Sequence, residues 1–217
     1  MTSMSSQELW DELYSEQDHI WSGAPNHALT VEAADLTPGR ALDVGCGEGA
    51  DAIWLAQRGW DVTGIDPSVV ALDRARRHAS ELKVAVTWRH GTLDGLDLPT
   101  EGFDLVSACY AVLEKDTDPL DRLTSLVAPG GTLLVVHHDM DGPDGDHHHG
   151  AGDHEGHGEQ EPDPRFDPTL LVMPAEVAAG LGEGWSVTGP ETRPRVISGG
   201  RGGHHVDDIV VRAVRRS

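Results

Sequence analysis

The stretch that decides the fold reads Leu42-Asp43-Val44-Gly45-Cys46-Gly47-Glu48-Gly49. Residues 41–44 are a short apolar run that ends at glycines, which is typical of a buried parallel strand. Glycines at the carboxyl end of such a strand permit a tight turn into the next helix and let backbone amides approach a ligand. We therefore expect a strand, a glycine turn at residues 45–49, and a helix over residues 50–58 that stops at Gly59.

Strands and helices alternate after this turn. Apolar runs predict strands at residues 60–65, 84–88, 103–109 and 132–136, the last after a turn at residues 129–131, and helical spacing predicts helices at residues 69–82 and 118–127. This alternation indicates βαβ units and a mostly parallel sheet. The tail predicts a helix at residues 174–181 and strands at residues 185–188 and 209–214, with a glycine-rich segment between the strands that favours an antiparallel return. The fold class is therefore α/β, a doubly wound seven-stranded sheet, mostly parallel with an antiparallel last strand.

Composition excludes several classes of partner. The 217 residues include 16 basic and 37 acidic side chains, a net charge of −21. Such a balance argues against nucleic acid and against an anionic membrane surface, because both are bound largely through Lys and Arg. The first 18 residues lack a basic and apolar leader, no apolar run approaches the roughly 20 residues of a membrane helix, and two cysteines are too few for a disulfide framework. We expect one cytoplasmic domain over residues 1–217.

A low-complexity insertion interrupts this domain at residues 139–167, between the sheet and a C-terminal segment, residues 168–217, that completes it. The insertion holds ten acidic residues and one basic residue, and residues 137–157 hold seven of the 13 histidines. Imidazoles and carboxylates suit divalent metal ions, and the candidate ligands are His147, His149, His154 and His157. A Gly-rich acidic loop does not fix ligand geometry, so we prefer a solvated loop that acts as a lid on the acceptor side.

An acidic residue follows the second predicted strand. Asp66 lies 23 positions after Asp43, where a carboxylate can accept hydrogen bonds from both hydroxyls of an adenosine ribose. Two ligand classes use this arrangement, dinucleotides and nucleosides without a pyrophosphate. Asp43 and Glu48 beside a pyrophosphate would be costly, whereas they favour a ligand that carries an ammonium and a sulfonium. A nicotinamide oxidoreductase remains a weaker alternative.

At these residues the sequence resembles the class I S-adenosylmethionine-dependent methyltransferases. Asp43 to Gly49 match the family's first motif, Asp66 its second-strand acid, residues 103–106 its fourth-strand motif, and residues 128–133 the turn before its fifth strand. The resemblance covers residues 35–138 and is closest to small-molecule members, similar to thiopurine and tellurite-resistance methyltransferases. It implies a Rossmann-like fold, S-adenosylmethionine as cofactor, and a small-molecule methyl acceptor.

The resemblance also assigns roles to individual residues. Gly45, Gly47 and Gly49 would line the methionine part of the cofactor, Asp43 would orient its amino group, and Asp66 would hold the ribose. Thr92 and Leu93 would cradle adenine, with Asp94 or a backbone carbonyl at its amino group. The remaining expected cofactor contacts are Cys46 in the turn, Pro67 beside Asp66, and Cys109. Residues 1–34 would form an N-terminal lid that brings Tyr14 and Trp21 to the cofactor.

The residues expected to face the methyl acceptor lie at the ends of the fourth and fifth predicted strands. Cys109 and Tyr110 would face the methyl group, and His137 or His138 would contact the acceptor; the catalytic candidates are His137, Cys109 and Tyr110. Neither an Asn/Asp-Pro-Pro-Tyr run nor a Pro-Cys motif follows the fourth strand, which disfavours methylation of nucleic acid bases. A thiol, an oxyanion, a phenol or an amine stays open as acceptor. The alternative function is a metal- or metalloid-binding protein on a methyltransferase scaffold.

Overall fold

A computed structural model describes residues 6–16, 20–140, 168–196 and 206–217. The strands are β1 (Arg40–Val44), β2 (Asp61–Asp66), β3 (Thr87–His90), β4 (Phe103–Cys109), β5 (Val127–His138), β6 (Trp185–Pro194) and β7 (Asp207–Arg215). The helices are α1 (Ser6–Ser15), α2 (His27–Glu32), α3 (Ala50–Gln57), α4 (Val69–Leu82), α5 (Pro119–Leu126) and α6 (Pro174–Gly180), with 3₁₀ turns at Lys115–Thr117 and Pro168–Leu170. None of the helices in these ranges is both long enough and apolar enough to cross a membrane.

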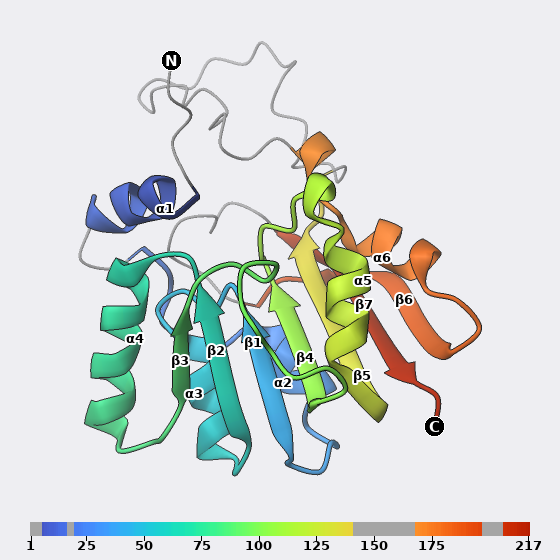
Figure 1. Cartoon of the computed structure of the whole chain (residues 1–217), viewed down its shortest axis with the longest axis horizontal. Coiled ribbons are helices and arrows are strands. Elements are labelled where there is room, and N and C mark those ends of the chain that lie inside the picture. The colour runs from blue at the N-terminus through green and yellow to red at the C-terminus, as the bar shows by residue number, and fades with distance from the viewer. Residues whose placement is uncertain (1–5, 17–19, 141–167, 197–205) are drawn as a thin grey trace.

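The seven strands form one sheet in the order β3-β2-β1-β4-β5-β7-β6 (Figure 1). β1 to β5 run parallel, and β7 is antiparallel to both β5 and β6. This order confirms the predicted α/β class with its antiparallel last strand. The strand order reverses between β1 and β4, and in open α/β sheets ligands bind outside the carboxyl ends of the strands at such a point.

Alternating side chains cover the sheet on both faces. Leu42 and Val44 of β1 pack in one buried cluster with Leu123 of α5 and Val177 of α6. Ala41 lies on the other face, in a cluster that α2 and α3 complete. Because both faces are covered, the central strands are largely apolar, which explains the apolar runs in the sequence.

Several element boundaries differ from expectation; the sixth strand, for example, was predicted at residues 185–188 but β6 runs to Pro194. The third strand was predicted at residues 84–88, but β3 begins at Thr87, since residues 84–86 pair with no strand. The turn predicted at residues 129–131 is instead an irregular start of β5, where the register shifts between Phe103 and Leu105 of the neighbouring β4. The helix over residues 69–82 agrees with α4 at both ends.

Candidate functional site

The glycine turn at residues 45–49 joins β1 to α3 at the carboxyl edge of the sheet. Gly45, Gly47 and Gly49 have φ of 68°, 51° and 86°, a left-handed region that other residues adopt at a cost. A Cβ on Gly47 would lie 2.7 Å from the Tyr14 hydroxyl, and one on Gly49 would lie 2.7 Å from the Trp88 ring. Conformation and space therefore both require glycine in this turn.

Asp66 ends β2 and is tied to the glycine turn. Its Oδ2 accepts a hydrogen bond from the Gly47 amide at 2.8 Å, and its Oδ1 accepts one from the Ser68 amide at 2.8 Å. Each carboxylate oxygen has a second lone pair for a further donor. Burial raises the pKa of Asp66 to about 6. The side chain is thus fixed in place with acceptor capacity left for a ligand.

Two further carboxylates lie beside the turn. Asp43 is buried, its Oδ1 accepts from the Ser107 hydroxyl at 3.3 Å, and its Oδ2 has no hydrogen-bond partner within the described chain. Asp51, in the first turn of α3, accepts from the Asn26 amide at 2.6 Å and from the Cys109 thiol. Burial and the nearby Asp51 raise the pKa of Asp43, and burial raises that of Asp51 to about 6. Sequence reasoning missed Asp51, although its place directly after the turn was a usable signal.

Glu48 does not face the site as the sequence suggested. Its Oε1 forms an ion pair with Arg74 of α4 at 2.8 Å, and both side chains are nearly buried. Arg74 also donates to the carbonyl of Tyr14 at 2.6 Å. The charge of Glu48 is therefore compensated within the protein, and the negative field of the site comes from Asp43, Asp51 and Asp66. Because Glu48 and Arg74 are 26 positions apart, no local sequence pattern indicates that they form an ion pair.

The N-terminal segment closes over the turn. The Trp21 indole donates to the Tyr14 hydroxyl at 2.8 Å, and this pair lies against Gly47. Asp11 of α1 accepts from the Ser68 hydroxyl at 2.6 Å and the Val70 amide at 3.2 Å, which fastens α1 to the start of α4. Figure 1 shows α1 above α4, at the upper left of the molecule. The predicted lid residues Tyr14 and Trp21 therefore do lie at the turn.

The other residues that were predicted to contact the cofactor differ in how far they are buried. Thr92 and Leu93 follow β3, which pairs with β2 up to Asp66. Leu93 is buried in the core, Thr92 is half-buried, and Asp94 is exposed. Pro67 follows Asp66 and is half-buried. Residues 92 and 93 thus follow the strand whose last residue, His90, is paired with Asp66.

Both cysteines are packing residues rather than reactive ones. Cys46 is buried, its amide donates to the Ile65 carbonyl at 3.0 Å, and its sulfur lies against Gly64. Burial raises the pKa of both thiols, and nearby carboxylates, Asp51 in the case of Cys109, raise them further. A thiol that stays protonated is a poor nucleophile. The structure therefore argues against Cys109 as the catalytic group.

An acceptor-side cluster, Tyr110, His137, His138 and Asp208, lies where β4 and β5 end and β7 begins. The Tyr110 hydroxyl donates to Asp208 Oδ2 at 2.8 Å, and His138 Nδ1 lies 3.3 Å from Asp208 Oδ1. The Tyr110 and His138 rings stack with centroids 4.3 Å apart, and the Arg195 guanidinium lies 5.2 Å from the Tyr110 ring centre. Asp208 was missed because it follows Tyr110 by 98 positions.

His137 and Tyr110 differ from their predicted roles. Burial and the adjacent His138 lower the pKa of His137 to about 4, so it is neutral at pH 7, and its buried Nδ1 has no hydrogen-bond partner within the described chain. Burial and Asp208 raise the pKa of Tyr110, so its hydroxyl donates rather than acting as a base. Both residues lie at the predicted edge, but the geometry gives neither of them a strongly basic atom.

The predicted metal ligands His147, His149, His154 and His157 lie outside the described residues, as does the insertion from residue 141 to 167. Within the described ranges no group of three His, Cys, Asp or Glu side chains is placed to hold a metal ion. Arg193 of β6 forms ion pairs with Glu32 and Glu191.

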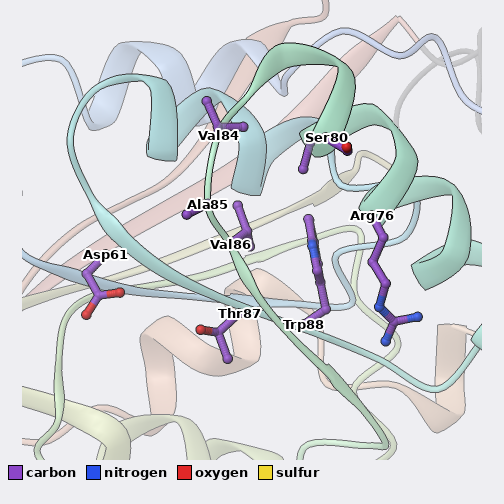
Figure 2. A pocket seen from close by; sticks show the side chains of 9 residues that line it. Asp61, Arg76, Ser80, Val84, Ala85, Val86, Thr87 and Trp88 are labelled. Carbon is purple, nitrogen blue, oxygen red and sulfur yellow. The ribbon is translucent and has the colours of Figure 1, made fainter.

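A separate groove of about 370 Å³ lies between α4 and β3 (Figure 2). It is lined by Asp61, Arg76, Ala79, Ser80, Val84, Ala85, Val86, Thr87 and Trp88. Asp61 is the first residue of β2, so the groove extends toward the amino end of the sheet, away from the glycine turn. The Trp88 ring separates this groove from the glycine turn, because the ring also packs against Gly49 and Gly64.

Asp51→Asn is expected to stabilise the ligand-free protein. The pKa of Asp51 is raised from 3.8 to about 6, so the folded chain holds this charge at a cost that is absent below pH 4 and grows up to about pH 6. Asparagine can still accept from the Asn26 amide and can donate to the Cys109 sulfur. We expect the free energy of unfolding to rise by roughly 1 to 2 kcal/mol at neutral pH and to change little near pH 4. This figure allows for the loss of a negative charge that stabilises the N-terminus of α3.

Urea unfolding of Asp51→Asn at both pH values measures this gain, with Asp61→Asn as the exposed control. An equal effect at the two pH values, or a loss of stability at neutral pH, contradicts the account of the buried charge.

Comparison with known proteins supports the geometry. Residues 41–131 match a family described as a methyltransferase domain. The ubiquinone biosynthesis O-methyltransferase of Alkalilimnicola ehrlichii is 44% identical over 99 residues, which cover 44% of this chain and 40% of the relative. An uncharacterized methyltransferase of Mycobacterium tuberculosis is 40% identical over 122 residues, covering 55% of this chain and 61% of the relative. The chain thus spans about half the length of these curated relatives.

Solved structures share the fold over nearly the whole chain. A structure from work on the conversion of a disulfide bond into a thioacetal group during echinomycin biosynthesis has a TM-score of 0.73 at 24% identity, covering 98% of this chain and 94% of that one. TehB from Haemophilus influenzae has a TM-score of 0.64 at 14% identity, and the match covers 95% of this chain and 66% of that one. The family match identifies residues 41–131 as a methyltransferase domain, and the seven-stranded sheet is similar to the folds of these two solved structures.

Proposed function

We propose that this protein binds S-adenosylmethionine at the glycine turn and transfers its methyl group to a small-molecule acceptor. The observation that carries the proposal is the set of three buried or partly buried carboxylates, Asp43, Asp51 and Asp66, around one turn. None of the ion pairs among the described residues involves any of the three. Buried negative charge without a partner is costly, and a cationic ligand removes that cost.

The residues at the turn fit this cofactor. Asp43 Oδ2 lacks a hydrogen-bond partner in the described chain and suits an ammonium group. Asp66 retains lone pairs for two ribose hydroxyls, and a glycine turn lets backbone amides approach a ligand closely. When bound, the sulfonium supplies an activated methyl group.

The same carboxylates disfavour a dinucleotide. A pyrophosphate at the turn would lie beside Asp43, Asp51 and Asp66, and each carboxylate would repel it or would have to stay protonated. The sequence suggested that Glu48 would repel a pyrophosphate, but its charge is compensated by Arg74. Asp51 supplies a further carboxylate beside the turn in its place. We therefore infer that the site selects a cationic nucleoside over a nicotinamide dinucleotide.

The chain's own residues position the reactants and exclude water. Tyr14 and Trp21 would cover the cofactor from the N-terminal side, with α1 fastened through Asp11. Tyr110 and the histidines at the end of β5 would form the acceptor wall. Alignment of acceptor, methyl carbon and leaving sulfur in a site closed to water supplies much of the rate of such a displacement. Because the relative from Alkalilimnicola ehrlichii is named as an O-methyltransferase, a hydroxyl is the first acceptor to test.

The test is methyl transfer from S-adenosylmethionine labelled in its methyl group to small phenols, thiols and amines. We expect labelled product with at least one class, and none with Asp66→Asn, while Asp61→Asn behaves as the unmodified protein. A chain that binds a divalent metal stoichiometrically but neither binds the donor nor transfers its label would instead support the metal-binding alternative, whose candidate ligands lie outside the described residues.

A further inference from the structure

A buried ion pair joins the glycine turn to the N-terminal segment. Glu48 lies in the turn, and its Oε1 pairs with Arg74 Nη1 of α4 at 2.8 Å; the two side chains are 5% and 11% exposed. The Nη2 of Arg74 donates to the Tyr14 carbonyl in α1 at 2.6 Å. The Oε2 of Glu48 accepts from the Trp21 amide at 3.4 Å. The pair therefore links α4 and the turn to both Tyr14 and Trp21.

The two aromatic residues that this ion pair holds lie directly on the glycine turn. The Trp21 indole donates to the Tyr14 hydroxyl at 2.8 Å. That hydroxyl lies 2.7 Å from the position that a Cβ on Gly47 would take, and the Trp21 indole nitrogen lies 3.6 Å from the same position. Tyr14 and Trp21 thus lie beside any ligand that the amides of the turn hold.

The N-terminal segment is held by a limited set of contacts in the part of the chain that the structure describes. α1 has ten residues, and a helix this short is marginal in water by itself. Asp11 accepts two hydrogen bonds from the start of α4. A small apolar cluster joins the segment to α4, and its buried members are Leu13, Tyr14, Ile20 and Ala71. The contacts of the buried ion pair are therefore a substantial part of what holds this segment on the turn.

We propose that Arg74 and Glu48 form a latch that holds Tyr14 and Trp21 over the glycine turn and thereby slows the release of the nucleoside bound there. The inference rests on the proposed function and extends it to the retention of the cofactor. Both latch residues act through the segment that they hold, so they are positioning residues. Their charges compensate each other, so we assign the pair to retention of the ligand and the three carboxylates at the turn to its charge selectivity.

Arg74→Lys tests the latch without changing the net charge. Lysine carries one nitrogen on a flexible stem, whereas the guanidinium presents its donors in a fixed planar fork. Lysine can keep the ion pair with Glu48 but is expected to lose the simultaneous bond to the Tyr14 carbonyl. We therefore expect S-adenosylhomocysteine to dissociate about tenfold faster. Stopped-flow tryptophan fluorescence at increasing nucleoside concentration gives the association rate constant as the slope and the dissociation rate constant as the intercept.

Arg76→Lys is the matched control for this variant. Arg76 lies on the same helix, is 45% exposed and pairs with Asp73 at 2.7 Å, so its substitution makes the same chemical change without touching the turn. The dissociation rate constant of this control should stay within about twofold of the unmodified protein. If charge alone mattered, both lysine variants would behave as the unmodified protein, because both keep the positive charge.

Glu48→Gln approaches the latch from the turn. Glutamine keeps the shape of the side chain but has one acceptor oxygen, so either the Arg74 guanidinium or the Trp21 amide loses its acceptor. We expect this variant also to release S-adenosylhomocysteine about tenfold faster. An unchanged dissociation rate constant would contradict the role of Glu48 in the latch.

Hydrogen exchange followed by mass spectrometry reports the position of the segment without any ligand. In Arg74→Lys the amides of α1 are expected to exchange at least severalfold faster, while the amides of β1 and β4 exchange as in the unmodified protein. A general loss of stability would instead accelerate exchange in the core strands as well. Equal acceleration in α1 and in these strands, or no change in α1, would therefore overturn the latch.

Calorimetry with S-adenosylhomocysteine separates the two levels of the account. If the unmodified protein binds this nucleoside but Arg74→Lys releases it at the same rate as Arg76→Lys, the latch is overturned and the proposed function stands. If the unmodified protein does not bind the nucleoside, the proposed function itself fails, whatever the hydrogen exchange of α1 shows.

Discussion

Asp66→Asn is expected to weaken the binding of S-adenosylhomocysteine roughly 100-fold or more, with the protein still folded. The carboxylate would accept hydrogen bonds from two ribose hydroxyls, each worth about 1.5 to 3 kcal/mol when the acceptor is charged. Asparagine has one acceptor oxygen, and its amide nitrogen would face the Gly47 or Ser68 amide, both of which donate to Asp66. Titration calorimetry measures the change.

The matched control for this variant is Asp61→Asn. Asp61 begins the same strand that Asp66 ends, and it is exposed. Its substitution removes the same charge from the same strand without touching the turn, so the affinity should stay within about twofold. A loss of less than threefold at Asp66, or similar losses at both positions, would show that the ribose-side assignment is wrong.

Gly49→Ala is expected to cost about 3 kcal/mol of folding free energy. Gly49 has φ of 86°, and its new Cβ would lie 2.7 Å from the Trp88 ring and 2.9 Å from the Ala75 Cβ. The left-handed conformation accounts for about 1 to 2 kcal/mol of the loss, and the overpacking accounts for the remainder. Urea unfolding followed by tryptophan fluorescence gives the free energy.

Gly23→Ala separates the two causes. Gly23 has φ of 73°, but among the described residues no atom outside Gly23 and its two chain neighbours lies within 4 Å of the position its Cβ would take. It therefore carries the conformational cost alone, and we expect a loss of about 1 to 2 kcal/mol. Equal losses at the two glycines would mean that the packing of the turn against Trp88 contributes nothing to stability.

The sequence predicted the parts of the site that are encoded locally. The strand, glycine turn, helix and second-strand acid follow one another within residues 41–66, and each has its own residue preference. The order of chain elements then fixed the topology, because parallel strands need helical crossovers and place their carboxyl ends at one edge. Asp66 could thus be assigned from its place after the second strand.

The features of the site that the sequence did not predict depend on contacts between segments that are far apart in the chain. Arg74 neutralises Glu48 across 26 positions, and Asp208 reaches Tyr110 across 98 positions. No periodicity or motif connects such pairs, so sequence reasoning left the charge of Glu48 uncompensated and did not link Tyr110 to Asp208. The third strand was misplaced for a related reason: it is a short edge strand with half-exposed residues and hence a weak apolar pattern.

The most direct test of the central claim compares S-adenosylmethionine with a nicotinamide dinucleotide by titration calorimetry at neutral pH. The three carboxylates at the turn predict that S-adenosylmethionine binds with a dissociation constant in the micromolar range, roughly −8 kcal/mol, while the nicotinamide dinucleotide produces no heat of binding. Binding of the dinucleotide with equal or greater affinity, or no heat with S-adenosylmethionine, would contradict a pocket built for a cationic ligand.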